Sequence, residues 1–176
     1  MKPDTTLEML IAKDEITEAL AAYCRAVDRL DMDLGRAVFH EDAVADYGAM
    51  YQGTGHGFME FVRAAHLTMQ TTGHHIGGVT IRVDGDLAGS ECYVIARLRS
   101  AAPDGALTDI VSHGRYVDRW ERRTDGVWRI AHRRYLHTMD ERRTVASASF
   151  PTTGSRDHDD PSYDVLRAPR GARCSP

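Results

Sequence analysis

The sequence DIVSHGRYVDRWERRTDGVWRIAHRRYLHT, residues 109–138, predicts two antiparallel strands joined by a tight turn. Thr124-Asp125-Gly126 marks the turn, because an Asp-Gly pair readily adopts the backbone geometry of a short hairpin loop. The flanking segments 109–123 and 127–138 are rich in β-branched and aromatic residues, which favour strands. Apolar residues occupy both faces of each segment, more than one buried face requires. This excess predicts a second buried face, such as a contact between subunits.

A second hairpin precedes this one in the chain. Val79, Ile81 and Val83 alternate with polar residues, as in a strand with one buried face. Asp84-Gly85-Asp86 then supplies a turn, and residues 88–100 return as the next strand. The two hairpins together predict a long antiparallel meander.

The N-terminal part of the chain is predicted to be helical. Apolar residues recur at three- and four-residue steps through residues 5–30, so they form one stripe along a helix. Shorter helices are expected after Asp31 and after Gly57, with a short β-like segment at residues 43–52 between them. Three helices followed by a meander predict an α+β fold whose helices cover one face of the sheet. A strongly bent sheet would close this arrangement into a cone with an internal pocket.

The length and the tail define the expected domain organisation. The chain has 176 residues, enough for one domain that buries about two-thirds of its surface. We place this domain at residues 1–150. Residues 151–176 are rich in proline, glycine and charged side chains, which predicts a C-terminal arm that is partly disordered.

Charge and apolar content exclude several classes of protein. The 22 Lys and Arg residues against 26 Asp and Glu give a net charge of −4, whereas a nucleic-acid partner normally needs a basic surface. No apolar run approaches the roughly 20 residues of a membrane span, and the N-terminus lacks the features of a signal peptide. Three widely spaced cysteines suit a reducing compartment. We therefore expect a cytoplasmic protein without membrane or nucleic-acid partners.

Four side chains are candidates for chemistry. Asp28 lies near the end of the first helix, off its apolar stripe, where a solvated carboxylate is the alternative. Tyr23 lies in the stripe, as a core aromatic whose hydroxyl can reach a pocket. His74 and His75 open a strand, so at most one of them faces any pocket. Arg133 in the last strand is either a solvated or ion-paired arginine or a cation over a pocket.

The same alternation disfavours a metal site built from both neighbouring histidines. No ligand spacing such as H-E-x-x-H occurs elsewhere. The hydrolase motif G-x-S-x-G, the P-loop and the dinucleotide motif G-x-G-x-x-G are also missing. Gly77-Gly78, directly after the histidines, predicts a bulge that re-aims a neighbouring side chain. We therefore expect no bound metal and no nucleotide cofactor.

Five stretches of the chain resemble the SnoaL-like family of the nuclear-transport-factor-2-like superfamily. They cover most of residues 8–165 and are Tyr23-Cys-Arg-Ala-Val-Asp28, Gly73-His-His-Ile-Gly-Gly-Val79, Arg82–Ala88, Arg119–Ile130 and Arg156–Tyr163. The resemblance implies a cone-shaped α+β barrel. In that fold, N-terminal helices are packed in a strongly curved antiparallel sheet around a deep, largely apolar pocket.

Within this family the chain is similar to three lyases, namely scytalone dehydratase, hexachlorocyclohexane dehydrochlorinase and bile-acid 7α-dehydratase. The resemblance implies an elimination from a ring by an Asp–His pair without metal or organic cofactor, and Asp28 and His74 match that pair. Tyr23 matches a tyrosine of the bile-acid enzyme, and Arg133 matches an arginine of the dehydrochlorinase. Arg97 stands near the position of a second catalytic histidine in scytalone dehydratase, which argues against scytalone as the substrate.

The expected function is a cofactor-independent lyase that acts on a small, largely hydrophobic cyclic substrate. His74 would be the general base and Asp28 would orient it. Tyr23 and Arg133 would stabilise the leaving group or a developing negative charge. Polyketide cyclases, steroid-type isomerases and non-catalytic modules that bind hydrophobic ligands share the fold, so these alternatives stay open. The excess of apolar strand residues predicts a homo-oligomer; the resemblance makes a trimer the first expectation, with a dimer as the alternative.

Overall fold

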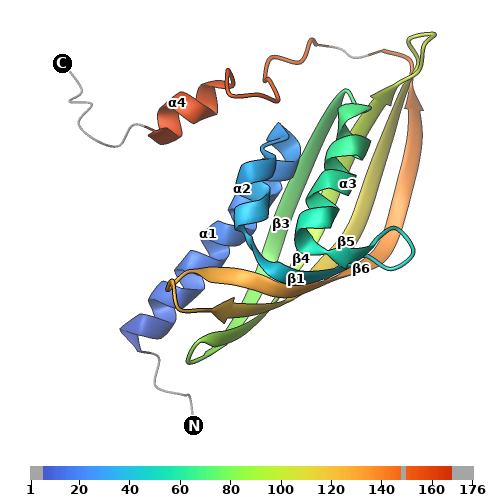
Figure 1. Ribbon diagram of the computed structural model, residues 1–176. Helices are drawn as coiled ribbons and strands as arrows, with labels where there is room; N and C mark the ends of the chain where they lie inside the picture. Colours follow the sequence, from blue (N-terminus) through green and yellow to red (C-terminus); the bar gives the residue numbers. More distant parts are fainter. Residues whose placement is uncertain (1–5, 148–149, 168–176) are drawn as a thin grey trace, which may run out of the picture.

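A computed structural model describes residues 6–147 and 150–167 of the chain. Helices come first and the long strands follow, as the sequence predicts (Figure 1). The elements in chain order are α1 (Leu7–Arg29), α2 (Met32–Ala37), β1 (Phe39–Asp46), β2 (Gln52–Thr54), α3 (Gly55–Leu67), β3 (Thr71–Asp84), β4 (Leu87–Ala101), β5 (Leu107–Arg122), β6 (Trp128–Val145) and α4 (Pro161–Arg167).

The strands form one six-stranded sheet in the order β2-β1-β6-β5-β4-β3. Three hairpins connect β3 to β6, so these four strands are antiparallel to their neighbours. β1 instead runs parallel to β6, and the prediction of a wholly antiparallel sheet is wrong for this pair. The reason is that β1 follows helix α2 and not a hairpin, and the apolar pattern of a strand does not specify the direction of its neighbour.

The sheet curves around α1 and α3, which confirms the predicted α+β cone, although the sheet is not closed (Figure 1). Register shifts in β3, between Gly77 and Thr80, and in the β5–β6 pair contribute bends. The bulge predicted at Gly77-Gly78 is confirmed, and Gly78 has a φ of +59° that favours glycine. At Gly114, a Cβ atom would lie only 2.4 Å from the ring of Tyr135, so this position requires glycine.

The apolar stripe of α1 forms the centre of the core, as predicted. Ile16, Leu20 and Val27 are at most 1% exposed, and they belong to one cluster with Trp120 and Ile130 of the sheet. The helix begins directly after the Thr6 cap, whose Oγ1 accepts a hydrogen bond from the Met9 N–H at 3.2 Å. No helix in the described part of the chain is long and apolar enough to cross a membrane.

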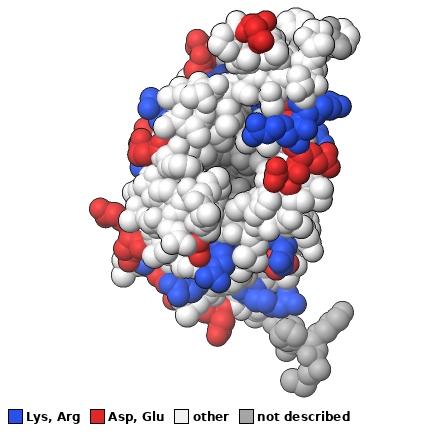
Figure 2. All heavy atoms as spheres, turned by 90° about the vertical axis from the view of Figure 1, so that its right-hand side faces the viewer, with Lys and Arg blue, Asp and Glu red and all other residues white. Residues whose placement is uncertain are grey.

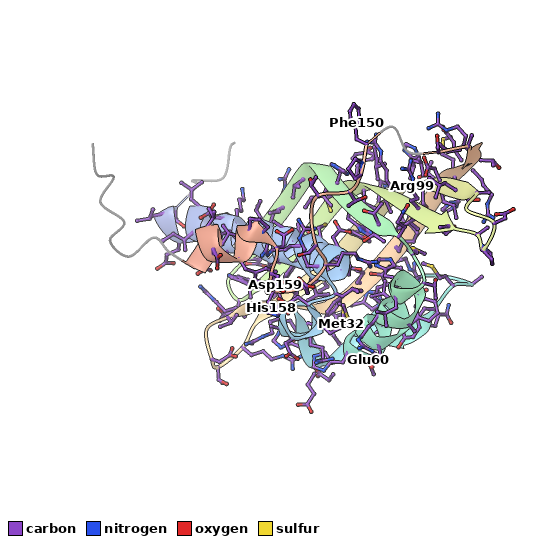
Figure 3. The ribbon with its side chains drawn as sticks, turned by 90° about the horizontal axis from the view of Figure 1, so that it is seen from above. Met32, Glu60, Arg99, Phe150, His158 and Asp159 are labelled. Atoms are coloured by element: carbon purple, nitrogen blue, oxygen red, sulfur yellow. The ribbon has the colours of Figure 1, made fainter. Side chains whose placement is uncertain are left out.

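Residues 150–160 cross the top of the molecule and lead into α4 (Figure 1, and from above in Figure 3). Arg25 donates a hydrogen bond to Ser162 Oγ at 2.9 Å, and its guanidinium lies 4.3 Å from the centre of the Tyr163 ring. The Tyr163 hydroxyl donates to Asp31 Oδ2 at 3.0 Å. The described part of the arm is therefore attached to α1. The domain boundary at residue 150 and the partial disorder of the arm stay predictions, and residues 168–176 lie outside the described residues.

Candidate active site

One side of the molecule is hollowed, and mostly uncharged residues surround the hollow (Figure 2). A cavity of about 460 Å³ lies between α3, the loop after β1 and the concave faces of β4, β5 and β6. Cavities of this size hold small organic ligands. Every lining residue is apolar, aromatic, serine or histidine: Tyr23, Tyr47, Ala49, Met50, Phe58, Phe61, Val62, Ala65, His66, Met69, His74, Val94, Ala96, Leu98, Ser112, Tyr116, Tyr135 and His137.

Asp28 and His74 meet at one wall of this cavity. The last turn of α1 carries Asp28, and the first residues of β3 carry His74. Nδ1 of His74 lies 2.7 Å from Oδ1 of Asp28, and the backbone N–H of His74 donates to Oδ2 at 2.8 Å. Both carboxylate oxygens are therefore held by one residue. The side chains of Asp28 and His74 are 13% and 9% exposed, with His74 lining the cavity and Asp28 behind it.

The electrostatics of this pair define which ring nitrogen of His74 is free. Burial alone would raise the pKa of the Asp28 carboxyl, but the hydrogen bonds and charge of His74 outweigh burial and lower that pKa. An ionised carboxylate only accepts hydrogen bonds, so Nδ1 of His74 carries the proton between them. Nε2 of the neutral ring is then an unprotonated acceptor on a residue that lines the cavity. His75 is exposed, as the strand alternation requires.

A second buried histidine, which the sequence reasoning did not select, lies next to His74. His66 is in the last turn of α3, is 4% exposed and lines the same cavity. Its Nδ1 lies 3.0 Å from the backbone oxygen of Val27, one residue before Asp28. The ring centres of His66 and His74 are 5.6 Å apart. No spacing signal in the sequence connects the two, because α3 meets β3 only through the tertiary fold.

Tyrosines form another part of the cavity wall. The Tyr23 and Tyr47 hydroxyls lie 2.9 Å apart, and the Tyr23 ring contacts that of Tyr116 edge to face. Burial raises the pKa of all three tyrosines well above the ordinary value, so these hydroxyls stay protonated. Tyr23 therefore lies at the cavity, as its place in the α1 stripe leads us to expect. Tyr47 and Tyr116 form the same wall, but in the sequence these two could be recognised only as aromatic residues of predicted strands.

Arg133 does not line the cavity. Its guanidinium donates two hydrogen bonds, at 2.8 and 2.7 Å, to the carboxylate of Asp118, and both side chains are fully buried. The guanidinium carbon lies 4.2 Å from the centre of the Tyr23 ring and 4.1 Å from that of Tyr116. Arg133 is thus ion-paired, one of the two alternatives that the sequence leaves open, and its buried cation packs against the tyrosine rings from behind.

Within residues 6–147 and 150–167, no three His, Cys, Asp or Glu side chains are grouped as metal ligands would be. The absence of a cofactor in the reaction stays a prediction.

Comparison with known proteins identifies the family. The model of the SnoaL-like domain matches residues 8–134, which is more than half of the chain. The chain belongs to the SnoaL-like domain family. None of the curated proteins compared with this member matches its sequence.

Solved structures share the fold of this SnoaL-like chain. A candidate scytalone dehydratase from Novosphingobium aromaticivorans is 22% identical with a TM-score of 0.66, over 81% of this chain and 96% of that one. A hexachlorocyclohexane dehydrochlorinase, LinA type 2, is 17% identical with a TM-score of 0.69, over 84% and 98% of the two chains. A candidate aromatic ring hydroxylase from N. aromaticivorans is 27% identical with a TM-score of 0.62, over 74% and 90%. The reactions that these names state differ in type. The likenesses therefore show a shared fold and do not indicate one particular reaction.

Proposed function

We propose that this SnoaL-like protein is a lyase that eliminates water or a similar small leaving group from a largely hydrophobic ring. The observation that carries the proposal is the partly buried Asp28–His74 pair, whose imidazole lines an apolar cavity. A module that only binds a hydrophobic ligand has no need for a partly buried carboxylate that holds one histidine tautomer. Burying an ionised group is costly, and such costs are typical of catalytic sites.

In the proposed reaction, Nε2 of His74 removes a proton from the carbon next to the one that bears the leaving group. The electron pair of the broken C–H bond forms the new double bond, and the leaving group departs with its bonding pair. Asp28 stabilises the imidazolium that forms, and His74 can return its proton to a departing hydroxide. General acid–base assistance of this kind contributes roughly 10² to 10⁴-fold, enough for an activated substrate.

The tyrosine hydroxyls stabilise the charge that develops. Tyr23 lines the cavity and carries a protonated hydroxyl, so it is placed to donate a hydrogen bond to a carbonyl or leaving oxygen. Arg133 acts one layer behind as a positioning residue, because its charge faces the Tyr23 and Tyr116 rings and its hydrogen bonds go to Asp118. The direct role that the resemblance implies for Arg133 is therefore replaced by an indirect one in this proposal.

The experiment follows elimination from a panel of cyclic β-hydroxy ketones, detected as the ultraviolet absorbance of the conjugated product. We expect His74→Gln and Asp28→Asn to lower turnover by about 10² to 10⁴-fold. His75→Gln, at the exposed neighbouring position, is the matched control and should keep wild-type turnover. Full activity of His74→Gln would contradict the proposal. A product with the mass of the substrate would favour the isomerase alternative with the same base.

We also propose that the protein is a homo-oligomer. Val94 and Tyr116 line the cavity, so Tyr93, Ile95 and Val117 point to the opposite face of the sheet, where Tyr93 is 59% exposed. Light scattering on the purified chain should give a multiple of 19.6 kDa, with a trimer expected from the resemblance. A monomeric mass at micromolar concentration would contradict this.

A further inference from the structure

The proposed elimination does not use the imidazole of His66, a buried polar group of the cavity. His66 is 4% exposed, and its ring centre lies 5.6 Å from that of His74. The rings are inclined by 34°, and both residues line the cavity. A ligand next to the His74 base is therefore also next to His66.

The protonation state of His66 follows from its partner. A backbone carbonyl can only accept a hydrogen bond, so the contact of 3.0 Å with the Val27 oxygen requires the proton on Nδ1. Nε2 is then an unprotonated acceptor, and it receives no hydrogen bond from residues 6–147 or 150–167. Burial lowers the pKa of His66, and the nearby charge of Arg156 acts in the same direction. The ring therefore stays neutral at neutral pH.

His66 and His74 differ in what holds Nδ1. The carboxylate behind His74 can stabilise a positive ring, whereas the neutral carbonyl behind His66 provides much less stabilisation. His74 is suited to take up a proton. His66 is suited to accept a hydrogen bond without taking the proton.

We infer that His66 binds the substrate by accepting a hydrogen bond from a hydroxyl or N–H group close to the carbon that loses its proton. The substrate class is then a hydroxylated or amino-substituted ring, and not a purely halogenated hydrocarbon. A ligand without a donor would cover the His66 Nε2 and leave a buried acceptor unsatisfied. The lost affinity is expected to be about 10-fold, a typical effect of one buried hydrogen-bonding group. The assignment of the reacting carbon rests on the proposed function, but the hydrogen bond to His66 does not.

The test compares two probes of similar size, para-ethylphenol and para-ethylfluorobenzene, by titration calorimetry with the full chain. The wild type should bind the phenol about 10-fold more tightly. His66→Asn keeps an amide N–H for the Val27 oxygen but offers no group at the Nε2 position, so the preference should disappear. His66→Gln reaches that position with an amide oxygen and should retain part of it. Equal binding of both probes by the wild type, or an unchanged preference in His66→Asn, would overturn the inference.

A second readout observes the hydrogen bond itself. In protein labelled with ¹⁵N-histidine, the phenol should shift the Nε2 resonance of His66, assigned by its loss in His66→Asn or, independently, in His66→Gln. The fluoro probe should leave that resonance close to its position in the free protein. An unmoved resonance at saturating phenol overturns the inference even if the Asn variant fails to fold. Neither measurement uses turnover, so a protein that binds the phenol through His66 but eliminates nothing would refute only the proposed function.

Discussion

His66 and His74 differ in chemistry because a different atom lies behind Nδ1 of each ring. Nδ1 of His74 meets a carboxylate oxygen at 2.7 Å, and Nδ1 of His66 meets a backbone oxygen at 3.0 Å. Each contact fixes the same tautomer, but only the carboxylate carries a charge that favours protonation of the ring. The same residue type thus supplies a base at one position and a neutral acceptor at the other.

This difference predicts how His66 contributes to stability as the pH changes. Since burial lowers the pKa of His66 in the folded chain, the unfolded chain binds a proton first, near its ordinary value of about 6.5. The contribution of His66 is complete above that pH and is lost as the pH falls below it. His66→Asn should therefore lose less stability than the wild type between about pH 8 and pH 5, by up to about 1.4 kcal/mol per pH unit.

Urea unfolding at a series of pH values measures this difference. His75→Asn serves as the control, because His75 is exposed and its removal should leave the pH dependence close to that of the wild type. Parallel pH profiles for His66→Asn and the wild type would contradict the predicted linkage.

Individual residues also show how far the sequence alone can lead. Asp28 and His74 could be selected as a pair because both match the Asp–His pair that the resemblance to SnoaL-like lyases implies, and the structure brings them within hydrogen-bond distance. The partner of Arg133 could not be selected. Trp120 opposes Ile130, so an unbroken ladder would place Asp118 opposite His132, but a bulge after Arg119 shifts the register by one residue. That shift pairs Asp118 with Arg133.

At the scale of elements, the helices, hairpins and order of the strands follow from periodicity and turn residues, whereas contacts between elements do not. The parallel pairing of β1 with β6 and the approach of α3 to β3 depend on how the whole sheet curves. His66 was missed for this reason. A histidine near the end of an amphipathic helix has the same local pattern whether it faces a pocket or fills a core.

Two helices end close to the candidate site, and one residue of the arm connects them. Arg156 donates to the Asp28 oxygen at 3.4 Å and, through Nη1, to the oxygens of His66 and Met69 at 2.9 Å each. Carbonyls at the C-terminal end of a helix lack partners within the helix and carry partial negative charge, so a cation satisfies them well. The arm thereby attaches to the backbone of Asp28, which positions the His74 tautomer, and to the backbone of His66 itself.

Arg156→Ala should loosen the arm and lower the free energy of unfolding by about 1 to 3 kcal/mol, since three hydrogen bonds to a charged group are lost. Arg156→Lys keeps the positive charge but lacks the planar guanidinium with its several N–H donors, so it should have an intermediate effect. Thermal unfolding and limited proteolysis within residues 150–167 measure these changes. Arg63→Ala, at an exposed arginine of α3, is the matched control. Equal protease resistance of Arg156→Ala and the wild type would contradict the proposed attachment.

At the scale of the whole molecule, the fold keeps a cavity of about 460 Å³ beside a well-packed core. Protein interiors are normally close-packed, and an apolar void costs stability because its lining atoms lose contacts. A fold of this size that keeps such a void does so at the expense of stability, as expected where function requires an open site.

Filling the cavity should therefore raise the free energy of unfolding and lower the affinity for a ligand. Ala65 lines the cavity from α3, and Ala65→Leu should raise the free energy of unfolding by about 0.5 to 2 kcal/mol. The added side chain occupies ligand space, so the affinity for para-ethylphenol should fall at least about 10-fold. Ala64→Leu places the same side chain on the exposed face of the same helix and should leave affinity unchanged. If Ala65→Leu bound the phenol as tightly as the wild type, the ligand would have to occupy a different part of the molecule, and the assignment of this cavity as the site would be wrong.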